Sequence, residues 1–109
     1  MLTEAEIADL VDRIADHLRP ERVILIGSYA KGTATPSSDL DILVVLDTNM
    51  AKRYRPPLIA PLIRGRSIPV DAHIYTPTEV AALGAVRFSF MDAWLRTGRV
   101  MYEAGGVRR

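Results

Sequence analysis

The sequence predicts a small α/β (α+β) domain in which a mixed sheet packs against helices. Three observations predict this class. Residues 3–18 carry apolar side chains at helical spacing, residues 22–26 and 39–46 contain continuous apolar runs, and residues 68–75 alternate apolar and polar side chains. These periodicities are those of an amphipathic helix, buried strands and a strand with one polar face. Because the chain has 109 residues, we expect one domain over residues 1–109.

The first three elements have clear boundaries. Thr3 and Glu6 have the spacing of a capping box, and Pro20 ends the helix that follows. The strand at 22–26 is apolar on both faces, which predicts a central position in the sheet. The strand at 39–46 is polar at its start and apolar afterwards, and we expect it to be central too.

The connecting segments are predicted from their glycines and prolines. We expect a short helical turn at 28–32, a loop at 33–38, and a loop followed by a short helix within 50–64. The last segment contains Pro56, Pro57 and Pro61, which should not lie deep inside one regular helix.

The C-terminal half predicts two helices and an edge strand. A helix should open at residues 76–79, with one side lined by Val80, Leu83 and Val86. A second helical stretch contains three aromatic residues, expected in the core or at an interface: Phe88, Phe90 and Trp94. Residues 100–102 should add an edge strand, and the tail from Gly105 should be frayed.

Composition excludes several classes of protein. There is no cysteine, so disulfides and thiolate metal sites are excluded. The N-terminal segment is acidic, unlike a signal peptide, and no apolar run is long enough for a membrane span. We therefore expect a cytoplasmic protein. The net charge of +1 does not indicate a nucleic-acid-binding protein, so we predict no direct binding to nucleic acid. Residues 48–70 nevertheless hold five basic and no acidic residues, which indicates either a solvated surface or one that faces an anion or partner: Lys52, Arg53, Arg55, Arg64 and Arg66.

Asp39 and Asp41 are the main candidates for chemistry. They lie two residues apart on a predicted strand, so both carboxylates should share one face. Like charges repel, whereas a divalent cation would turn the same arrangement into a binding site. A solvated strand end is the simpler alternative, and the pair alone does not decide between the two.

A glycine-bounded turn precedes this pair. Gly27 and Ser28 follow a buried strand, where backbone N–H groups and a hydroxyl could bind an anion. A Gly-Ser pair is usually just a turn, and Gly32 is by default a helix C-cap.

Together, residues 27–44 resemble the signature of the polymerase β-type nucleotidyltransferase superfamily, and within it the minimal nucleotidyltransferases. The quoted segments are Gly27-Ser28-Tyr29-Ala30-Lys31-Gly32 and Ser38-Asp39-Leu40-Asp41-Ile42-Leu43-Val44. The resemblance implies the fold of that core and a transfer of AMP from ATP, assisted by Mg²⁺, with two ions expected. Lys31 stands where relatives often have arginine. Lysine keeps the positive charge but loses the bidentate geometry of arginine towards phosphate.

The resemblance also implies roles for single residues. Nucleotide binding would fall to Gly27, Ser28, Lys31, Gly32 and Ser38. Asp39 and Asp41 would hold metal, and the family places a third carboxylate on a later strand. Asp71 is our candidate for this third metal-binding and catalytic group, because it lies on the polar side of the strand at 68–75. Its simpler interpretation is a solvated edge strand, and His73 on the same side is more simply a half-exposed histidine. Poorer rivals for the third carboxylate are Asp47, Glu79 and Asp92.

The resemblance further implies a partner. The catalytic core would occupy nearly the whole chain, so we expect acceptor recognition to come from another protein or a second copy. Minimal nucleotidyltransferases are typically the antitoxins of helical toxins of the HEPN type, to which they transfer AMP. Two alternatives stay open, namely a non-catalytic antitoxin or interaction module and a small-molecule (antibiotic) nucleotidyltransferase. The sequence does not identify the acceptor, the number of units transferred or the oligomeric state.

Overall fold

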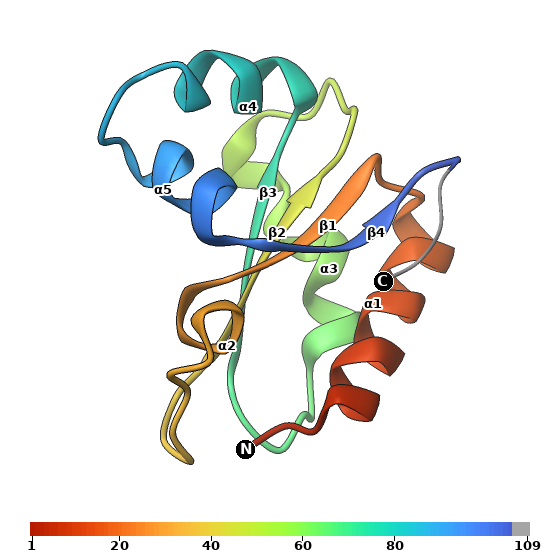
Figure 1. The fold of residues 1–109 in the computed structure, drawn as a ribbon. Helices are drawn as coiled ribbons and strands as arrows, with labels where there is room; N and C mark the ends of the chain where they lie inside the picture. Colours follow the sequence, from red (N-terminus) through yellow and green to blue (C-terminus); the bar gives the residue numbers. More distant parts are fainter. Residues whose placement is uncertain (106–109) are drawn as a thin grey trace.

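A four-stranded sheet lies between two groups of helices in the computed structural model, which describes residues 1–105 (Figure 1). The expected frayed tail lies largely outside the described residues. In chain order the elements are α1 (Glu4–Leu18), β1 (Arg22–Ile26), α2 (Gly27–Lys31), β2 (Leu40–Val45), the 3-10 helix η1 (Lys52–Tyr54), α3 (Pro56–Ile63), β3 (Val70–Tyr75), α4 (Pro77–Gly84), α5 (Phe90–Thr97) and β4 (Arg99–Glu103). The predicted α+β class with a mixed sheet is confirmed.

The strand order is β3-β2-β1-β4. β1 pairs with β2 and β4 in antiparallel fashion, whereas β2 and β3 run parallel and are connected through α3. Both strands predicted to be central, β1 and β2, are central, and β3 and β4 form the edges. The β2–β3 register places Asp41 directly beside Asp71.

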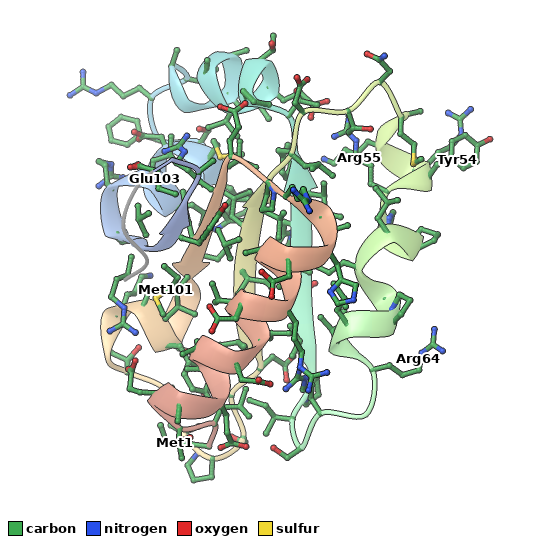
Figure 2. The ribbon with its side chains drawn as sticks, turned by 90° about the vertical axis from the view of Figure 1, so that its right-hand side faces the viewer. Met1, Tyr54, Arg55, Arg64, Met101 and Glu103 are labelled. Carbon is green, nitrogen blue, oxygen red and sulfur yellow. The ribbon has the colours of Figure 1, made fainter. Side chains whose placement is uncertain are left out.

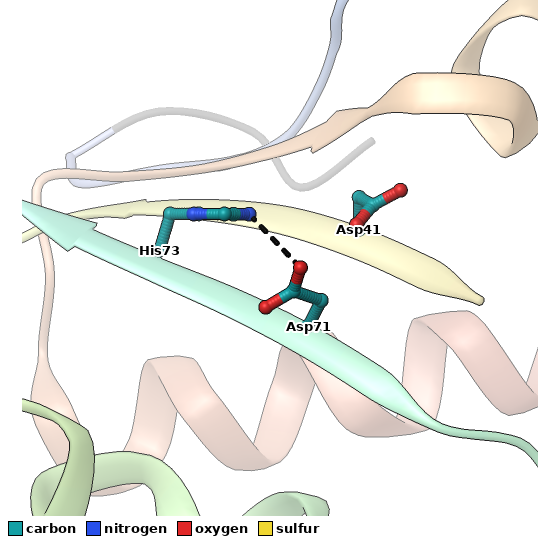
Figure 3. A group of neighbouring side chains, drawn as sticks. All are labelled: Asp41, Asp71 and His73. Atoms are coloured by element: carbon teal, nitrogen blue, oxygen red, sulfur yellow. Dashed lines mark ion pairs between the residues drawn. The ribbon is translucent and has the colours of Figure 1, made fainter.

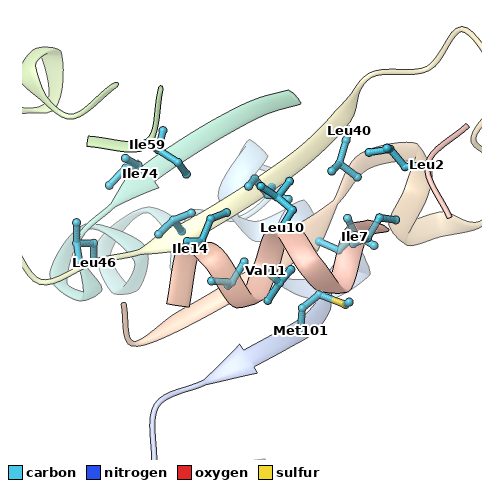
Figure 4. Packing of buried hydrophobic residues seen from close by; sticks show 14 residues of the cluster. Leu2, Ile7, Leu10, Val11, Ile14, Leu40, Leu46, Ile59, Ile74 and Met101 are labelled. Carbon is cyan, nitrogen blue, oxygen red and sulfur yellow. The ribbon is translucent and has the colours of Figure 1, made fainter. Parts of the chain in front are cut away.

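The first face of the sheet carries the larger core. The helix α1 turns Ile7, Leu10 and Ile14 towards the strands, and each of these side chains is at most 2% exposed (Figure 4). From β2, Ile42 and its even-numbered neighbours point into the same core. Burial of each such side chain contributes about 1.5–3 kcal/mol to folding. The predicted capping box starts α1, since Thr3 Oγ1 accepts from the Glu6 N–H at 3.1 Å and Glu6 Oε1 accepts from the Thr3 N–H at 2.9 Å.

The second face is covered only in part. Leu43 and Val45 of β2 pack with Val80 of α4 and Met91 of α5. Asp41 lies on the same face because residues 41, 43 and 45 alternate with the core residues of β2. The apolar cover ends before Asp41 is reached, so this end of the face is left for polar side chains.

Two sequence-based expectations are wrong in the C-terminal half. The structure places Pro61 inside α3, because Pro56 and Pro57 occupy the first turn, where no N–H is needed, and Pro61 forfeits a single backbone bond. The helix expected to be lined by Val80, Leu83 and Val86 ends at Gly84, so Val86 lies outside α4. Only Val80 of the three is buried, whereas Leu83 is 40% and Val86 is 55% exposed.

Among residues 1–105 no helix is long and apolar enough to cross a membrane.

Candidate active site

Two carboxylates from neighbouring parallel strands face each other on the second side of the sheet. Asp41 on β2 is the register partner of Asp71 on β3 (Figure 3). One carboxylate oxygen of each and one ring nitrogen of His73 all lie within 4.8 Å of one another. The helix α1 lies on the opposite side of the strands, as Figure 3 shows. Asp71 therefore lies close to Asp41, as expected. The catalytic roles of both residues remain predictions.

His73 extends this group along β3. Its Nε2 is 3.5 Å from Asp71 Oδ2, and its ring lies 4.8 Å, centroid to centroid, from that of Trp94 on α5. From the sequence, His73 was expected on the same side of its strand as Asp71, with a half-exposed histidine as the simpler interpretation. Its contact with Trp94 had no local signal, because it depends on where α5 packs.

Electrostatics single out Asp41. Partial burial raises the pKa of this carboxyl above its usual value, and the nearby Asp71 carboxylate raises it further. His73 acts in the opposite direction, and Asp39 adds a smaller upward effect. An apo site that disfavours its own negative charge is one that a cation would stabilise.

Gly27 lies directly against Asp41. Its backbone has φ +72°, a left-handed conformation that glycine adopts without a steric penalty. A Cβ atom built at this position would sit 2.6 Å from Asp41 Oδ2. Both the turn and the close approach therefore require glycine here. The first residue of α2 is therefore packed against the partly buried carboxylate of Asp41 on β2.

The other predicted nucleotide-binding residues surround this turn. Ser28 and Lys31 lie in α2, which begins without a side-chain cap at its N-terminus and ends at Gly32 with φ +73°. Gly32 therefore takes the C-cap position that is its ordinary interpretation. The hydroxyl of Ser38 accepts from the Thr35 N–H at 2.8 Å and so helps to fold the loop between α2 and β2.

Asp39 is separated from the pair formed by Asp41 and Asp71. It is exposed and lies one residue before the start of β2, since that strand begins at Leu40 rather than at residue 39. It is not among the three residues whose ligand atoms converge. It still contributes to the pKa of Asp41, so it belongs to the rim of the site.

The rival carboxylates are engaged elsewhere or lie outside the site. Glu79 caps α4 and forms a bidentate pair with Arg55, with Oε1 2.6 Å from Nη1. The hydrogen bond from Arg55 lowers the pKa of Glu79. Asp92 accepts from the Phe88 N–H and pairs with Arg96 on α5, and Asp47 is exposed after β2.

Arg55 is a structural residue and not a mobile phosphate contact. It is 5% exposed and also donates to the carbonyl oxygens of Met50 and Ile74. The suggestion that the whole basic segment 48–70 faces an anion is therefore wrong for Arg55. Figure 2 shows Tyr54 and Arg64 near the two ends of α3, on its outer side.

The aromatic residues of the C-terminal half are only partly in the core. Trp94 packs against the cluster of Val80 and Met91, but Phe88 is 83% and Phe90 is 82% exposed. Their assignment to the core is wrong, and their assignment to an interface stays a prediction.

Comparisons with known proteins agree with this geometry. A family model described as a nucleotidyltransferase domain matches residues 7–94. A protein of Methanocaldococcus jannaschii named "Putative protein adenylyltransferase" is 31% identical over 104 residues, which cover 94% of this chain and 100% of that relative. The chain therefore belongs to the nucleotidyltransferase domain family, and its assignment to that class of enzyme is confirmed.

Solved structures share the fold. A Sulfolobus solfataricus protein titled "putative nucleotidyltransferase" superposes with a TM-score of 0.68 at 22% identity, over 94% of this chain and 82% of that one. A toxin–antitoxin structure with AMP-PNP gives 0.63 at 19% identity, over 90% of this chain and 74% of that one. A mutant of the toxin–antitoxin MntA-HpeT gives 0.59 at 21% identity, over 96% and 76%. At these identities the likeness shows the fold.

Proposed function

We propose that this chain transfers AMP from ATP to a hydroxyl group of a partner protein. The observation that carries the proposal is the contact between the Gly27 turn and Asp41, which in turn faces Asp71. That arrangement joins an anion-binding turn to a carboxylate pair within one site. The named protein adenylyltransferase aligned over 94% of this chain supports a protein as the acceptor.

The nucleotide would enter over the start of α2. The N–H groups at Gly27 and Ser28 and the Ser28 hydroxyl supply donors for the β- and γ-phosphates. Lys31, Gly32 and Ser38 would border the triphosphate, with Lys31 as a point charge. The positive φ of Gly27 keeps the backbone close to the carboxylates.

The carboxylates fit a hard divalent cation. Asp41 and Asp71 offer two oxygens at short range, and burial followed by repulsion from Asp71 raises the pKa of Asp41. Mg²⁺ prefers carboxylate oxygens together with substrate phosphates. Asp41 and Asp71 would hold the ion, with Asp39 at the rim. When bound, Mg²⁺ would neutralise charge that develops on the phosphate oxygens.

The transfer breaks a phosphoanhydride bond of ATP and forms a phosphoester bond to the acceptor. The acceptor oxygen forms a bond to the α-phosphorus, the bond from that phosphorus to the bridging oxygen breaks, and pyrophosphate leaves. Asp71, the exposed carboxylate of the pair, would take the hydroxyl proton. Asp41 and Gly27 would position the reacting phosphate.

A toxin of the HEPN type is the partner that we propose, with this chain as its antitoxin. Two structures titled as toxin–antitoxin share the fold and support this arrangement. One of them contains the ATP analogue AMP-PNP, which supports ATP as the nucleotide.

The test is intact-mass spectrometry of the co-purifying partner after incubation with the chain, ATP and Mg²⁺. We expect a mass increase of one or more AMP units, absent with Asp41→Asn. An unmodified partner that is still neutralised by the Asp41→Asn chain would instead identify a non-catalytic interaction module. AMP found only on small hydroxyl compounds would identify a small-molecule enzyme.

A further inference from the structure

The arrangement of the site defines the side from which an acceptor must arrive. Along the sheet the order is Gly27 at the end of β1, then Asp41 on β2, then Asp71 on β3. Attacking and leaving oxygens lie roughly in line in phosphoryl-type transfers. If pyrophosphate leaves towards Gly27 and Ser28, the acceptor oxygen approaches across β3, the edge strand.

That edge contains a pocket. Its volume is about 180 Å³, and its lining includes Lys52, Pro56, His73 and Tyr75. Lys52 Nζ donates to the Tyr75 hydroxyl at 2.7 Å and lies 4.1 Å from the centre of the Tyr75 ring. His73 belongs both to this pocket and to the group around Asp71, so pocket and carboxylates are continuous.

Two of the basic residues near this edge, Lys52 and Arg53, have no ion pair among the described residues. Arg55 is paired with Glu79, and Arg66 with Asp9. Lys52 and Arg53 are exposed, and within residues 1–105 neither lies within ion-pair distance of a carboxylate. Arg53 stacks its guanidinium 4.7 Å from the centre of the Tyr54 ring, which leaves the charge facing solvent.

We infer that the outer edge of β3 binds an extended, acidic segment of the acceptor protein, with Lys52 and Arg53 receiving its carboxylates. This inference rests on the proposed function. Asp71 and Tyr75 are four residues apart on one strand face, which is about 13 Å. A segment whose hydroxyl lies at Asp71 therefore places a residue about four positions away at Lys52. The acceptor is predicted to carry Glu or Asp about four positions from the modified hydroxyl.

Protein fits this edge better than nucleic acid does. The chain has a net charge of only +1, whereas nucleic-acid-binding domains carry an extended basic surface. Lys52 and Arg53 could each bind a carboxylate of a protein segment. The pocket beside them is partly lined by Pro56 and Ala72, which could contact apolar side chains of the same segment.

The test is fluorescence anisotropy with the full chain at low ionic strength, without ATP. The probes are a labelled ten-residue peptide with one tyrosine and glutamates four and five positions away, the same peptide with lysines instead, and a labelled oligouridine. We expect the acidic peptide to bind about fivefold or more tightly than the lysine peptide, since two exposed ion pairs contribute about 1 kcal/mol. Lys52→Glu/Arg53→Glu should remove this preference.

The control is Arg87→Glu/Arg96→Glu, which makes the same change of charge away from β3, where Arg87 lies over the Phe88 ring and Arg96 pairs with Asp92 of α5. This control should leave binding of the acidic peptide within about twofold. Four outcomes overturn the inference: equal binding of the two peptides, no measurable binding of the acidic one, tighter binding of oligouridine, or a loss caused by the control variant. Because ATP is absent, a failure of AMP transfer would leave this result standing. Conversely, if AMP transfer is observed but the chain does not prefer the acidic peptide, only the inference of an acidic acceptor segment is overturned.

Discussion

The environment of Asp41 is determined by the Gly27 turn, by partial burial and by the neighbouring Asp71 carboxylate. It touches Gly27 on one side and faces Asp71 on the other. The alternation of 68–75 was enough to predict that Asp71 lies on the polar side of its strand, because strand faces follow from period two. Its place beside Asp41 depends on how the strands pair. The exposed position of Asp39 could not be predicted, since the start of β2 depends on which residue first pairs with β3. The same limit applies to His73, whose neighbour Trp94 comes from a distant helix.

Gly27→Ala and Gly32→Ala form a matched pair of variants. Both glycines have positive φ, +72° and +73°, so each alanine should cost about 1–2 kcal/mol of stability. Only at Gly27 would the new Cβ meet a neighbour, Asp41 Oδ2, whereas nothing lies within 4 Å at Gly32. We therefore expect similar losses of Tm, but a loss of AMP transfer of about tenfold or more only for Gly27→Ala. Equal activity of the two variants in a transfer assay would contradict the close approach.

Asp41→Asn should separate activity from stability. The folded pKa of Asp41 is raised above 3.8, so the folded state binds this proton more tightly than the unfolded state. Stability therefore falls as pH rises through the folded pKa, and at neutral pH the ionised carboxylate disfavours the apo fold. Without Mg²⁺ we expect Asp41→Asn to have a higher Tm at pH 7 by calorimetry, and AMP transfer reduced by about 10²-fold or more. A lower Tm for this variant would show that Asp41 contributes to folding.

At the scale of elements, an ion pair connects the segment after β2 to α4. Arg55, at the start of α3, donates to Glu79, which caps α4, and to the Ile74 carbonyl of β3. The sequence indicated a helix that opens at residues 76–79 with a proline in its first turn, and this is confirmed. The sequence did not indicate the partner of Glu79, because the pair joins residues 24 positions apart. The expected position of Val86 on this helix is wrong, because α4 ends at Gly84.

Glu79→Gln should weaken this connection in a pH-dependent way. The Arg55 hydrogen bond lowers the pKa of Glu79 below 4.5, so its contribution is present above that value and is lost as pH falls through the folded pKa. We expect the variant to lose about 1–3 kcal/mol at pH 7, because Arg55 is left with an imperfect partner. The difference in Tm from the wild type should shrink as the pH falls through the lowered pKa of Glu79. Glu21→Gln, at an exposed position, is the control and should show no such trend; a constant difference for Glu79→Gln would contradict the ion pair.

At the scale of the molecule, the sheet has one filled face and one half-filled face. The filled face under α1 supplies most of the buried side chains, and the other leaves room for the carboxylates beside α5. The fold class and the central pair of strands could be predicted because their apolar runs are local features of the sequence. The parallel pairing of β2 with β3, which brings Asp71 to Asp41, was not predicted, because the family resemblance implied only a third carboxylate on a later strand.

Ile42→Ala tests the filled face. Its side chain is 0% exposed, so removing it should lower the free energy of unfolding by about 2–5 kcal/mol in urea titrations. Val86→Ala is the control, since Val86 is 55% exposed and should change stability by about 0.5 kcal/mol or less. A large loss at Val86 would show that the segment after α4 is covered in solution.

We propose that Asp41 and Asp71 act together on the α-phosphate of a nucleotide held at Gly27. The decisive experiment uses two preparations of ATP, radiolabelled at the α- or the γ-phosphate. Each is incubated with Mg²⁺, the co-purifying partner and either the wild-type chain or Asp41→Asn/Asp71→Asn. We expect label on the partner from the α-position only, and none with the double variant. Label from the γ-position, or equal α-labelling by the double variant, would contradict this role of the two aspartates.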